Sequence, residues 1–230
     1  MIERKFIAEN MKEFQIQEYI SNTLKNVGHS HTKLQRTPLG EKILIYTSRP
    51  GLVVGRKGEN IRKLTNTLKK KFGLENPTIE IAEVEAPNLD ARITAERIAS
   101  TLERFGLQKF KAIGHKTMQD VMNSGALGIE IIMSGKIPSA RAKSWRFYKG
   151  YLKKCGFVAM TQVRRAQACA QMKSGTVGIK VAIMPPDIVL PDDISVIQDP
   201  KEKETMNVKD QKEDATDTTN VTTEKMEKQK

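Results

Sequence analysis

The chain has 230 residues and a formal net charge of +12. The last 32 residues are net acidic, so residues 1–198 alone carry a net charge of +14. This length allows one large or two small domains, and a body this basic indicates a polyanionic partner, with a membrane surface as the alternative. Because no apolar run is long enough to span a bilayer and residues 1–5 lack the apolar core of a signal peptide, we expect a soluble, intracellular protein.

The few cysteines and histidines argue against metal chemistry. Cys155 and Cys169 have no metal-like spacing, and in a reducing compartment we expect both to be free thiols. His29 and His31 stand in a segment of Gly, Ser and Thr without a neighbouring carboxylate or cysteine, which predicts a solvated turn. We therefore predict neither a metal site nor a cofactor.

The first elements in chain order are a helix and a pair of strands. Apolar residues near helical spacing predict a helix over residues 9–27, with Asn10 as its cap and Gly28 at its end. An alternating segment at 33–37 and an apolar run at 41–48 predict two strands joined by a short turn.

A glycine loop organises the segment that follows. Gly55 and Gly58 bracket Arg56 and Lys57, after a short apolar turn and before an amphipathic helix predicted over residues 60–72. Glycine lets the backbone approach a ligand closely, and a helix that starts here directs free N–H groups and a positive dipole end toward the loop. An anion such as a phosphate fits this layout, which is that of the KH-domain loop that clamps nucleotides by their backbone. The helix adds two cations to the candidate RNA-binding set, Arg62 and Lys63.

The order of the elements supports the same interpretation. With a strand predicted over 77–84, the order is helix, strand, strand, helix, glycine loop, helix, strand, which is that of a type II KH domain. An ordinary turn is the competing explanation, because Gly-x-x-Gly recurs at 125–128 and 175–178 without basic residues inside. The preceding strand, the basic pair and the following helix favour nucleic-acid binding for the first loop.

The second half is predicted to combine helices with strands. Helical spacing predicts helices over residues 89–105 and 109–123. A turn followed by a strand is predicted at 124–133 and again at 174–184, and the similarity of these two segments is either an internal repeat or a coincidence. Aromatic residues among basic ones predict a further strand over 142–154.

Two segments give weaker patterns. The alanines and paired arginines of residues 161–172 favour a helix by propensity, whereas the neighbouring strands favour a sheet partner. From Asp199 onward the charge is mixed and aromatic residues are absent, so this segment cannot bury enough apolar surface to offset its chain entropy. We predict a disordered tail.

Acidic residues are missing from a long basic interval. Between Glu130 and Asp187 the chain holds eleven basic residues and no acid, and a second acid-free run covers residues 104–119. Such a surface should neutralise many phosphates and bind RNA with a steep salt dependence. The candidate residues are Lys109, Lys111 and Lys116 on the predicted helix, and Lys136, Arg141, Lys143, Arg146, Arg164 and Arg165 beyond it.

At this point the sequence resembles a known family. The segments that carry the resemblance are 47–61, 81–84, 89–91, 125–130, 134–136, 140–144 and 178–187. They are similar to universal ribosomal protein three of the small subunit, in its archaeal and eukaryotic branch. The resemblance implies an α+β fold, with a type II KH domain over residues 1–86 and a C-terminal domain over 87–194, followed by the tail at 195–230. The C-terminal domain would hold a four-stranded, mostly antiparallel sheet packed by helices, which makes residues 161–172 a strand.

The resemblance also implies a location and partners. Family members sit in the head of the small subunit, so we expect a cytoplasmic, ribosome-bound protein that contacts small-subunit rRNA, incoming mRNA and neighbouring ribosomal proteins, and no membrane. The family lines the channel through which mRNA enters with basic residues of the helix that corresponds to 109–123. Where relatives carry adjacent arginines, this chain has Lys111-Ala112, so one positive charge is missing.

Two other functions compete with this one. A free KH-type RNA regulator would bind short single strands without the ribosome, although only 5% of residues are aromatic and most of these lie outside the KH part. An enzyme, such as the DNA lyase activity credited to some relatives, would need an activated amine or base, and no lysine is marked as one. No Gly-x-x-x-x-Gly-Lys-Ser/Thr motif occurs, so we predict a protein that is not an enzyme.

Overall fold

The protein was analysed as a computed structural model that describes residues 2–37, 40–74, 76–138, 140–191 and 194. The tail predicted at 195–230 lies outside the described residues, as does most of the turn predicted at 38–40. Within the described chain, buried apolar residues form two separate clusters, one within residues 16–81 and one within 89–183. The fold is therefore mixed α+β, with an N-terminal KH domain and a C-terminal domain built on a second core.

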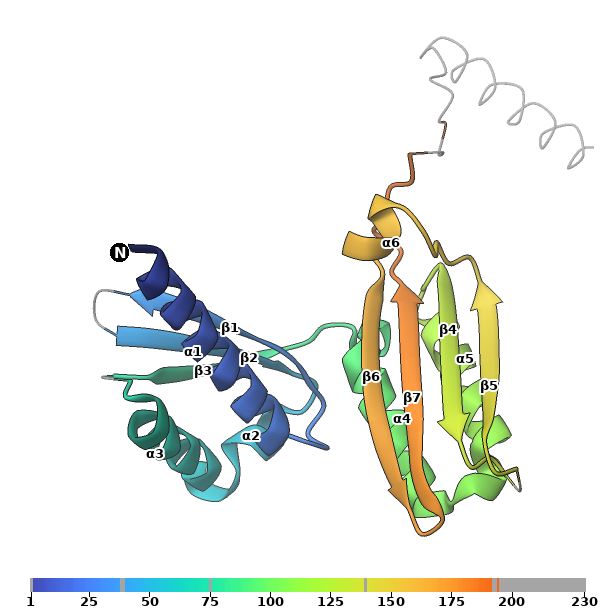
Figure 1. Ribbon diagram of the computed structural model, residues 1–230, viewed down its shortest axis with the longest axis horizontal. Coiled ribbons are helices and arrows are strands. Elements are labelled where there is room, and N and C mark those ends of the chain that lie inside the picture. The colour runs from blue at the N-terminus through green and yellow to red at the C-terminus, as the bar shows by residue number, and fades with distance from the viewer. Residues whose placement is uncertain (1, 38–39, 75, 139, 192–193, 195–230) are drawn as a thin grey trace, which may run out of the picture. The chain divides into compact units, whose positions relative to one another are not determined.

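The N-terminal part contains a three-stranded sheet with helices on one face (Figure 1). Its order β1-β2-β3 pairs β1 with β2 antiparallel and β2 with β3 parallel. Parallel strands need a crossover connection, which here contains two helices and the glycine loop. The elements are α1 (Ile2–Thr23), β1 (His29–Thr37), β2 (Gly40–Thr47), α2 (Pro50–Val54), α3 (Glu59–Phe72) and β3 (Thr78–Glu83). This order confirms the predicted type II KH topology.

Apolar side chains of the helices and of the central strand form the N-terminal core. Ile43 and Ile45 alternate along β2 toward the helices, and both are fully buried. The helices supply Ile16, Ile20, Leu24, Leu64 and Leu68. Phe14 of α1 is 62% exposed, because the first half of this helix has too few buried neighbours to form a continuous face. The helix starts at Ile2 rather than at residue 9, since good helix formers continue to the N-terminus.

His29 corrects a prediction made from its neighbours. It stands in strand β1 rather than in a solvated turn, and only 1% of it is exposed. Its Nε2 lies 2.8 Å from the hydroxyl of Thr32, and its Cα is paired with that of Thr47 on β2. The polar composition of the segment hid the fact that it pairs with an apolar strand, whose contacts decide its conformation.

Burial of His29 makes stability dependent on pH. Desolvation, with the Arg92 guanidinium acting in the same direction, lowers the pKa of this imidazole to about 4. In the unfolded chain His29 therefore takes up a proton near pH 6.5, whereas in the folded chain it does so only near pH 4. The free energy of unfolding should therefore be highest above pH 6.5 and should decrease as the pH falls from 6.5 toward 4. We expect a decrease of about 1–2 kcal/mol between about pH 7 and pH 5.

Urea unfolding of the wild type and of His29→Gln at the two pH values measures this contribution. The variant should be less stable at neutral pH and should lose less stability on acidification than the wild type does. Equal pH dependence in both proteins would show that His29 is not the group that titrates.

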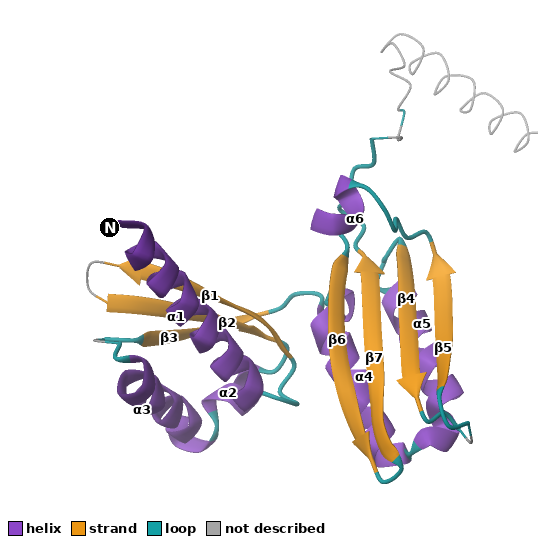
Figure 2. Cartoon of the chain, viewed as in Figure 1, coloured by secondary structure: helices purple, strands orange, loops and turns teal. Residues whose placement is uncertain are grey.

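The C-terminal part is a four-stranded antiparallel sheet of order β5-β4-β7-β6. Helices α4 and α5 cover one face of it, and α6 lies at one end (Figures 1 and 2). The elements are α4 (Ala91–Phe105), α5 (Phe110–Asn123), β4 (Gly128–Gly135), β5 (Lys143–Gly150), α6 (Phe157–Thr161), β6 (Arg164–Met172) and β7 (Gly175–Met184). Strand β6 confirms what the resemblance implied for residues 164–172 of the segment 161–172, where helix propensity alone was misleading, whereas Thr161 is the last residue of α6.

The helix-covered face of this sheet is apolar. Every second residue of the central strands is buried, from Ile129, Ile131 and Met133 on β4 and from Val177, Ile179, Val181 and Ile183 on β7. Helix α4 begins after Asp90, whose carboxylate accepts a hydrogen bond of 2.8 Å from the Arg92 amide. Phe105 is 53% exposed, because it is the last residue of α4.

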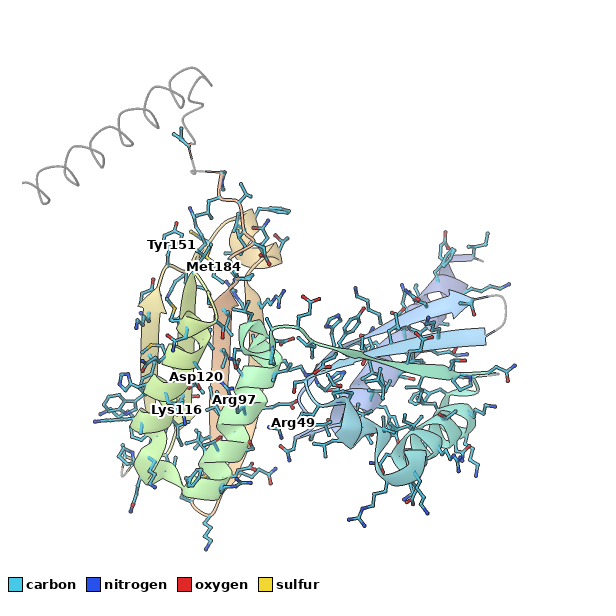
Figure 3. All side chains as sticks on the ribbon, turned by 180° about the vertical axis from the view of Figure 1, so that it is seen from behind. Arg49, Arg97, Lys116, Asp120, Tyr151 and Met184 are labelled. Atoms are coloured by element: carbon cyan, nitrogen blue, oxygen red, sulfur yellow. The ribbon has the colours of Figure 1, made fainter. Side chains whose placement is uncertain are left out.

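Two glycines allow very close backbone packing at one end of β4. Gly128 begins β4 opposite Gly150 of β5, and a Cβ placed on Gly128 would lie 2.0 Å from the Tyr151 carbonyl oxygen. That backbone is fixed, because the Tyr151 amide donates to the Leu127 carbonyl at 2.8 Å. The Leu127 amide in turn donates to the Met184 carbonyl at 3.0 Å. Figure 3 labels Tyr151 and Met184 at this end of the sheet.

Candidate nucleic-acid interface

The backbone of the glycine loop adopts positive φ angles at both of its glycines. Gly55 has φ 70° and ψ −175°, a conformation essentially restricted to glycine, and Gly58 is left-handed with φ 74°. A Cβ on Gly55 would also lie 2.5 Å from the Asn60 side chain. Lys57 adopts φ 53° between them, which is uncommon for a residue with a side chain. The loop therefore holds an unusual shape between α2 and α3.

This shape presents two exposed cations in front of a helix. Arg56 and Lys57 are exposed at the tip, and α3 begins directly after Gly58. The predicted juxtaposition of a basic pair with a helix N-terminus is thus present, and it suits an anion. The two cations predicted on α3, Arg62 and Lys63, are both exposed. The ammonium group of Lys63 lies 2.6 Å from the Glu59 carboxylate.

Helix α5 separates a buried face from a basic face. Phe110, Ile113, Gly114, Thr117 and Val121 are buried against the sheet. The opposite face exposes the predicted residues Lys111 and Lys116, together with Ala112 and His115. Gly114 permits this close packing, because a Cβ there would lie 2.9 Å from the Phe147 ring. Figure 3 labels Lys116 and Asp120 on α5, the latter facing Arg97 of α4 at 3.8 Å.

The N-terminal end of α5 concentrates positive charge. Lys109 occupies the N-cap position without a capping hydrogen bond from its side chain, Lys111 lies in the first turn, and this turn contains no acid. Cations at this end of a helix oppose its dipole, each at a cost of a few tenths of a kcal/mol to about 1 kcal/mol. The ammonium groups of Lys111 and Lys143 lie 4.8 Å and 5.0 Å from the centroid of the Trp145 ring. Two elements thus place lysines on one indole, and an anion would relieve their repulsion.

The nine predicted basic residues of the second half do not form one surface. Lys136 and Arg141 are exposed in the connection between β4 and β5, at the end of the sheet where Lys143 begins β5. They therefore lie at the same end as the start of α5. The side chains of Arg146 and Arg165 point to the face of the sheet that is not covered by α4 and α5. Arg164 is the first residue of the edge strand β6.

The charge pattern did not reveal how Glu130 is paired. This carboxylate is the acid that ends the basic interval, and it is almost buried on β4. Its Oε1 accepts from Arg146 on the neighbouring strand and from Lys154 at 3.1 Å. Only the strand register, which places Glu130 opposite Tyr148, shows that these residues share one face.

The described residues contain no helix that is both long and apolar enough to cross a membrane.

Comparisons with known proteins cover both parts of the chain. Residues 15–89 match the family described as KH domain, and residues 98–183 match the family described as Ribosomal protein S3, C-terminal domain. The chain is 45% identical over 203 residues to small ribosomal subunit protein uS3 of Methanocaldococcus jannaschii, which covers 88% of this chain and 97% of that protein.

Two further relatives give the same picture. The protein of the same name from Methanococcus aeolicus is 42% identical over 206 residues, or 90% of this chain and 98% of the relative. That of Methanobrevibacter smithii is 43% identical over 197 residues, or 86% of this chain and 78% of the relative. The similarity therefore spans the KH part and the sheet domain together.

Proposed function

Because this chain belongs to the family of small ribosomal subunit protein uS3, we propose that it both builds the small subunit and guides mRNA into it. The family relationship makes the protein a structural component of the small ribosomal subunit that binds rRNA. The KH fold agrees with this role, since its glycine loop contacts nucleotides through their backbone. The ribosome is accordingly where the protein resides.

The basic face of α5 carries the proposal for mRNA. Lys109, Lys111 and Lys116 are exposed on or beside the first two turns of one helix, and Lys143 joins them through Trp145. Clustered lysines at the positive end of a helix dipole suit a moving polyanion, because they attract phosphates without reading bases. We assign to this face the contact with incoming mRNA, and to the KH loop a contact with rRNA.

The same reasoning extends to organisation and chemistry. The two separate cores support domains over residues 1–86 and 87–194. The function is structural rather than catalytic, and neighbouring proteins of the subunit head complete the surroundings of the chain. Each of these assignments rests on the family relationship together with the observed cores and charges.

Neutralising the three lysines of the helix tests the mRNA assignment. In cells that depend on a Lys109→Gln, Lys111→Gln, Lys116→Gln variant, we expect normal small-subunit levels but a several-fold drop in translation of messages with structured leaders. The reason is that the variant loses phosphate contacts only where mRNA passes, and each lost contact lowers affinity and salt dependence. Gradient sedimentation measures assembly, and a pair of reporters with structured and unstructured leaders measures translation.

A charge-matched variant controls for net charge. Arg4→Gln, Lys5→Gln, Lys12→Gln removes three exposed cations from α1 and should leave both reporters unchanged. If the α5 variant translated structured messages normally, the channel assignment would be wrong. A chain that never sedimented with small subunits but bound short RNAs would instead favour the free KH-type regulator.

A further inference from the structure

The face of the C-terminal sheet opposite α4 and α5 is open along its centre. Figure 1 looks onto this face, with both helices behind the strands and α6 at one end. Because side chains alternate along a strand, the residues between the buried ones point to this side. Their exposure agrees, since Arg146, Gln167, Cys169 and Lys180 are all exposed.

The strand register arranges these residues in rows. One row runs Arg146, Ile132, Lys180, Gln167 across the four strands, and the next runs Tyr148, Glu130, Ala182, Arg165. A third row consists of Ser144, Ser134, Gly178 and Cys169. With strands ~4.8 Å apart, each row is ~14 Å long, which is enough for about two or three nucleotides of an extended strand. The small residues in these rows, such as Ser134, Gly178 and Ala182, have short side chains that leave room for a ligand between the cations.

The charge of this face is one-sided. Glu130 is the one acid in the three rows, and it is held by Arg146 and Lys154, whose side chains remain about half exposed. Lys180 and Arg165 add two further exposed cations to this face. The carboxylate thus fixes two cations in place while leaving the face with a net positive charge.

An aromatic ring completes the surface. Tyr148 is 46% exposed, and the Arg146 guanidinium lies 5.1 Å from its ring centroid. Flat sheets that combine exposed aromatic rings with cations bind single-stranded RNA by stacking bases and neutralising phosphates. We propose that this open sheet face, defined by Arg146, Tyr148, Arg165 and Lys180, binds a single-stranded segment of RNA, separately from the α5 face and the KH loop.

This inference rests on the proposed RNA-binding function and adds a third surface to it. Strand β5 divides between two surfaces, because Lys143 and Trp145 point toward α5 whereas Arg146 and Tyr148 point the other way. One strand therefore separates the two RNA contacts by the thickness of the sheet. RNA on the open face would not compete with mRNA on α5.

Binding of a fluorescein-labelled oligouridylate to the purified full chain tests the open face. In an Arg56→Asp, Lys57→Asp background, which removes the KH-loop contact, the further change Arg165→Gln, Lys180→Gln should weaken binding about tenfold and lower the logarithmic salt slope by about 1.4, as expected for two lost contacts to a single strand. Arg4→Gln, Lys149→Gln removes the same residue types from elsewhere and should change neither quantity. An equal loss in both variants, or in neither, overturns the inference.

Cys169 provides a second readout that does not depend on charge. It is an exposed thiol in the third row of the open face, opposite Gly178. In a Cys155→Ser background, saturating oligouridylate should slow alkylation of Cys169 by N-ethylmaleimide several-fold, and the Arg165→Gln, Lys180→Gln variant should lose this protection. Alkylation of Cys169 that is unchanged by saturating oligouridylate would show that single-stranded RNA does not cover this face, and the inference would be wrong.

The variant Arg56→Asp, Lys57→Asp distinguishes failure of the proposed RNA-binding function from failure of the open sheet face alone. If the wild type binds no RNA, the proposed RNA-binding function fails together with this inference. If the KH-loop variant weakens binding while Arg165→Gln, Lys180→Gln causes no further loss in that background, only the open-face inference fails. If both changes weaken binding and only Arg165→Gln, Lys180→Gln abolishes the protection of Cys169 by RNA, the inference holds.

Discussion

Replacing Gly128 by alanine should destabilise the C-terminal sheet by at least about 3 kcal/mol, the largest effect that we expect of any single methyl group in this chain. The new Cβ would lie 2.0 Å from the Tyr151 carbonyl oxygen and 2.5 Å from its carbon. Backbone atoms cannot rotate away as a side chain can, and hydrogen bonds through Leu127 hold both neighbouring strands at this point. Relief therefore requires separation of β4 from β5 or loss of pairing at their ends.

Urea unfolding of the full chain, followed by circular dichroism, measures this loss. Gly51→Ala is the matched control, because a Cβ there meets nothing within 4 Å and its backbone is not left-handed. It should be neutral or slightly stabilising, since alanine is a better helix former than glycine within α2. A change of less than about 0.5 kcal/mol for Gly128→Ala would show that the strands can shift to admit a side chain.

The double variant Arg56→Asp, Lys57→Asp should reduce RNA affinity about 100-fold at low salt. Charge-assisted contacts with phosphate contribute about 1.5–3 kcal/mol each, and reversal replaces attraction by repulsion at the tip of the loop. The logarithmic salt slope should fall by about 1.4, since two phosphates are no longer neutralised on a single strand. Aspartate tolerates the left-handed backbone of position 57, so the fold should persist.

The control uses the other end of the same helix. Lys69→Asp, Lys70→Asp reverses two exposed charges in the last turn of α3, far from the glycine loop. Fluorescence anisotropy with a labelled oligouridylate at several salt concentrations compares the two variants. A similar loss in both would mean that RNA senses only the net charge of the domain and that the loop has no special role.

The sequence predicted the KH fold because several local signals agreed with each other. Gly55 and Gly58 bracket a basic pair, the helix that follows had clear apolar spacing, and the strands alternated or were continuously apolar. The structure has the same order of elements and the same loop geometry. In the second half, β6 was ambiguous because its alanines favour a helix, and only pairing with β7 makes it a strand.

What could not be predicted depends on contacts between distant residues. His29 was placed in a turn because its neighbours are polar, yet pairing with β2 buries it. The basic residues from 136 to 165 were treated as one surface, because composition contains no information on which side of a strand each residue points. The register of β4 with β5 separates Lys143 from Arg146 and reveals the pairing of Glu130.

The two apolar cores have a consequence for synthesis of the chain. Every residue of the first core lies before position 82, and every residue of the second lies after 88. The N-terminal domain can therefore close as soon as its last strand leaves the exit tunnel, while the remaining residues are still being translated. A nascent chain could then engage its RNA target before the rest of the protein exists, so that assembly into the particle would proceed in the same direction as elongation.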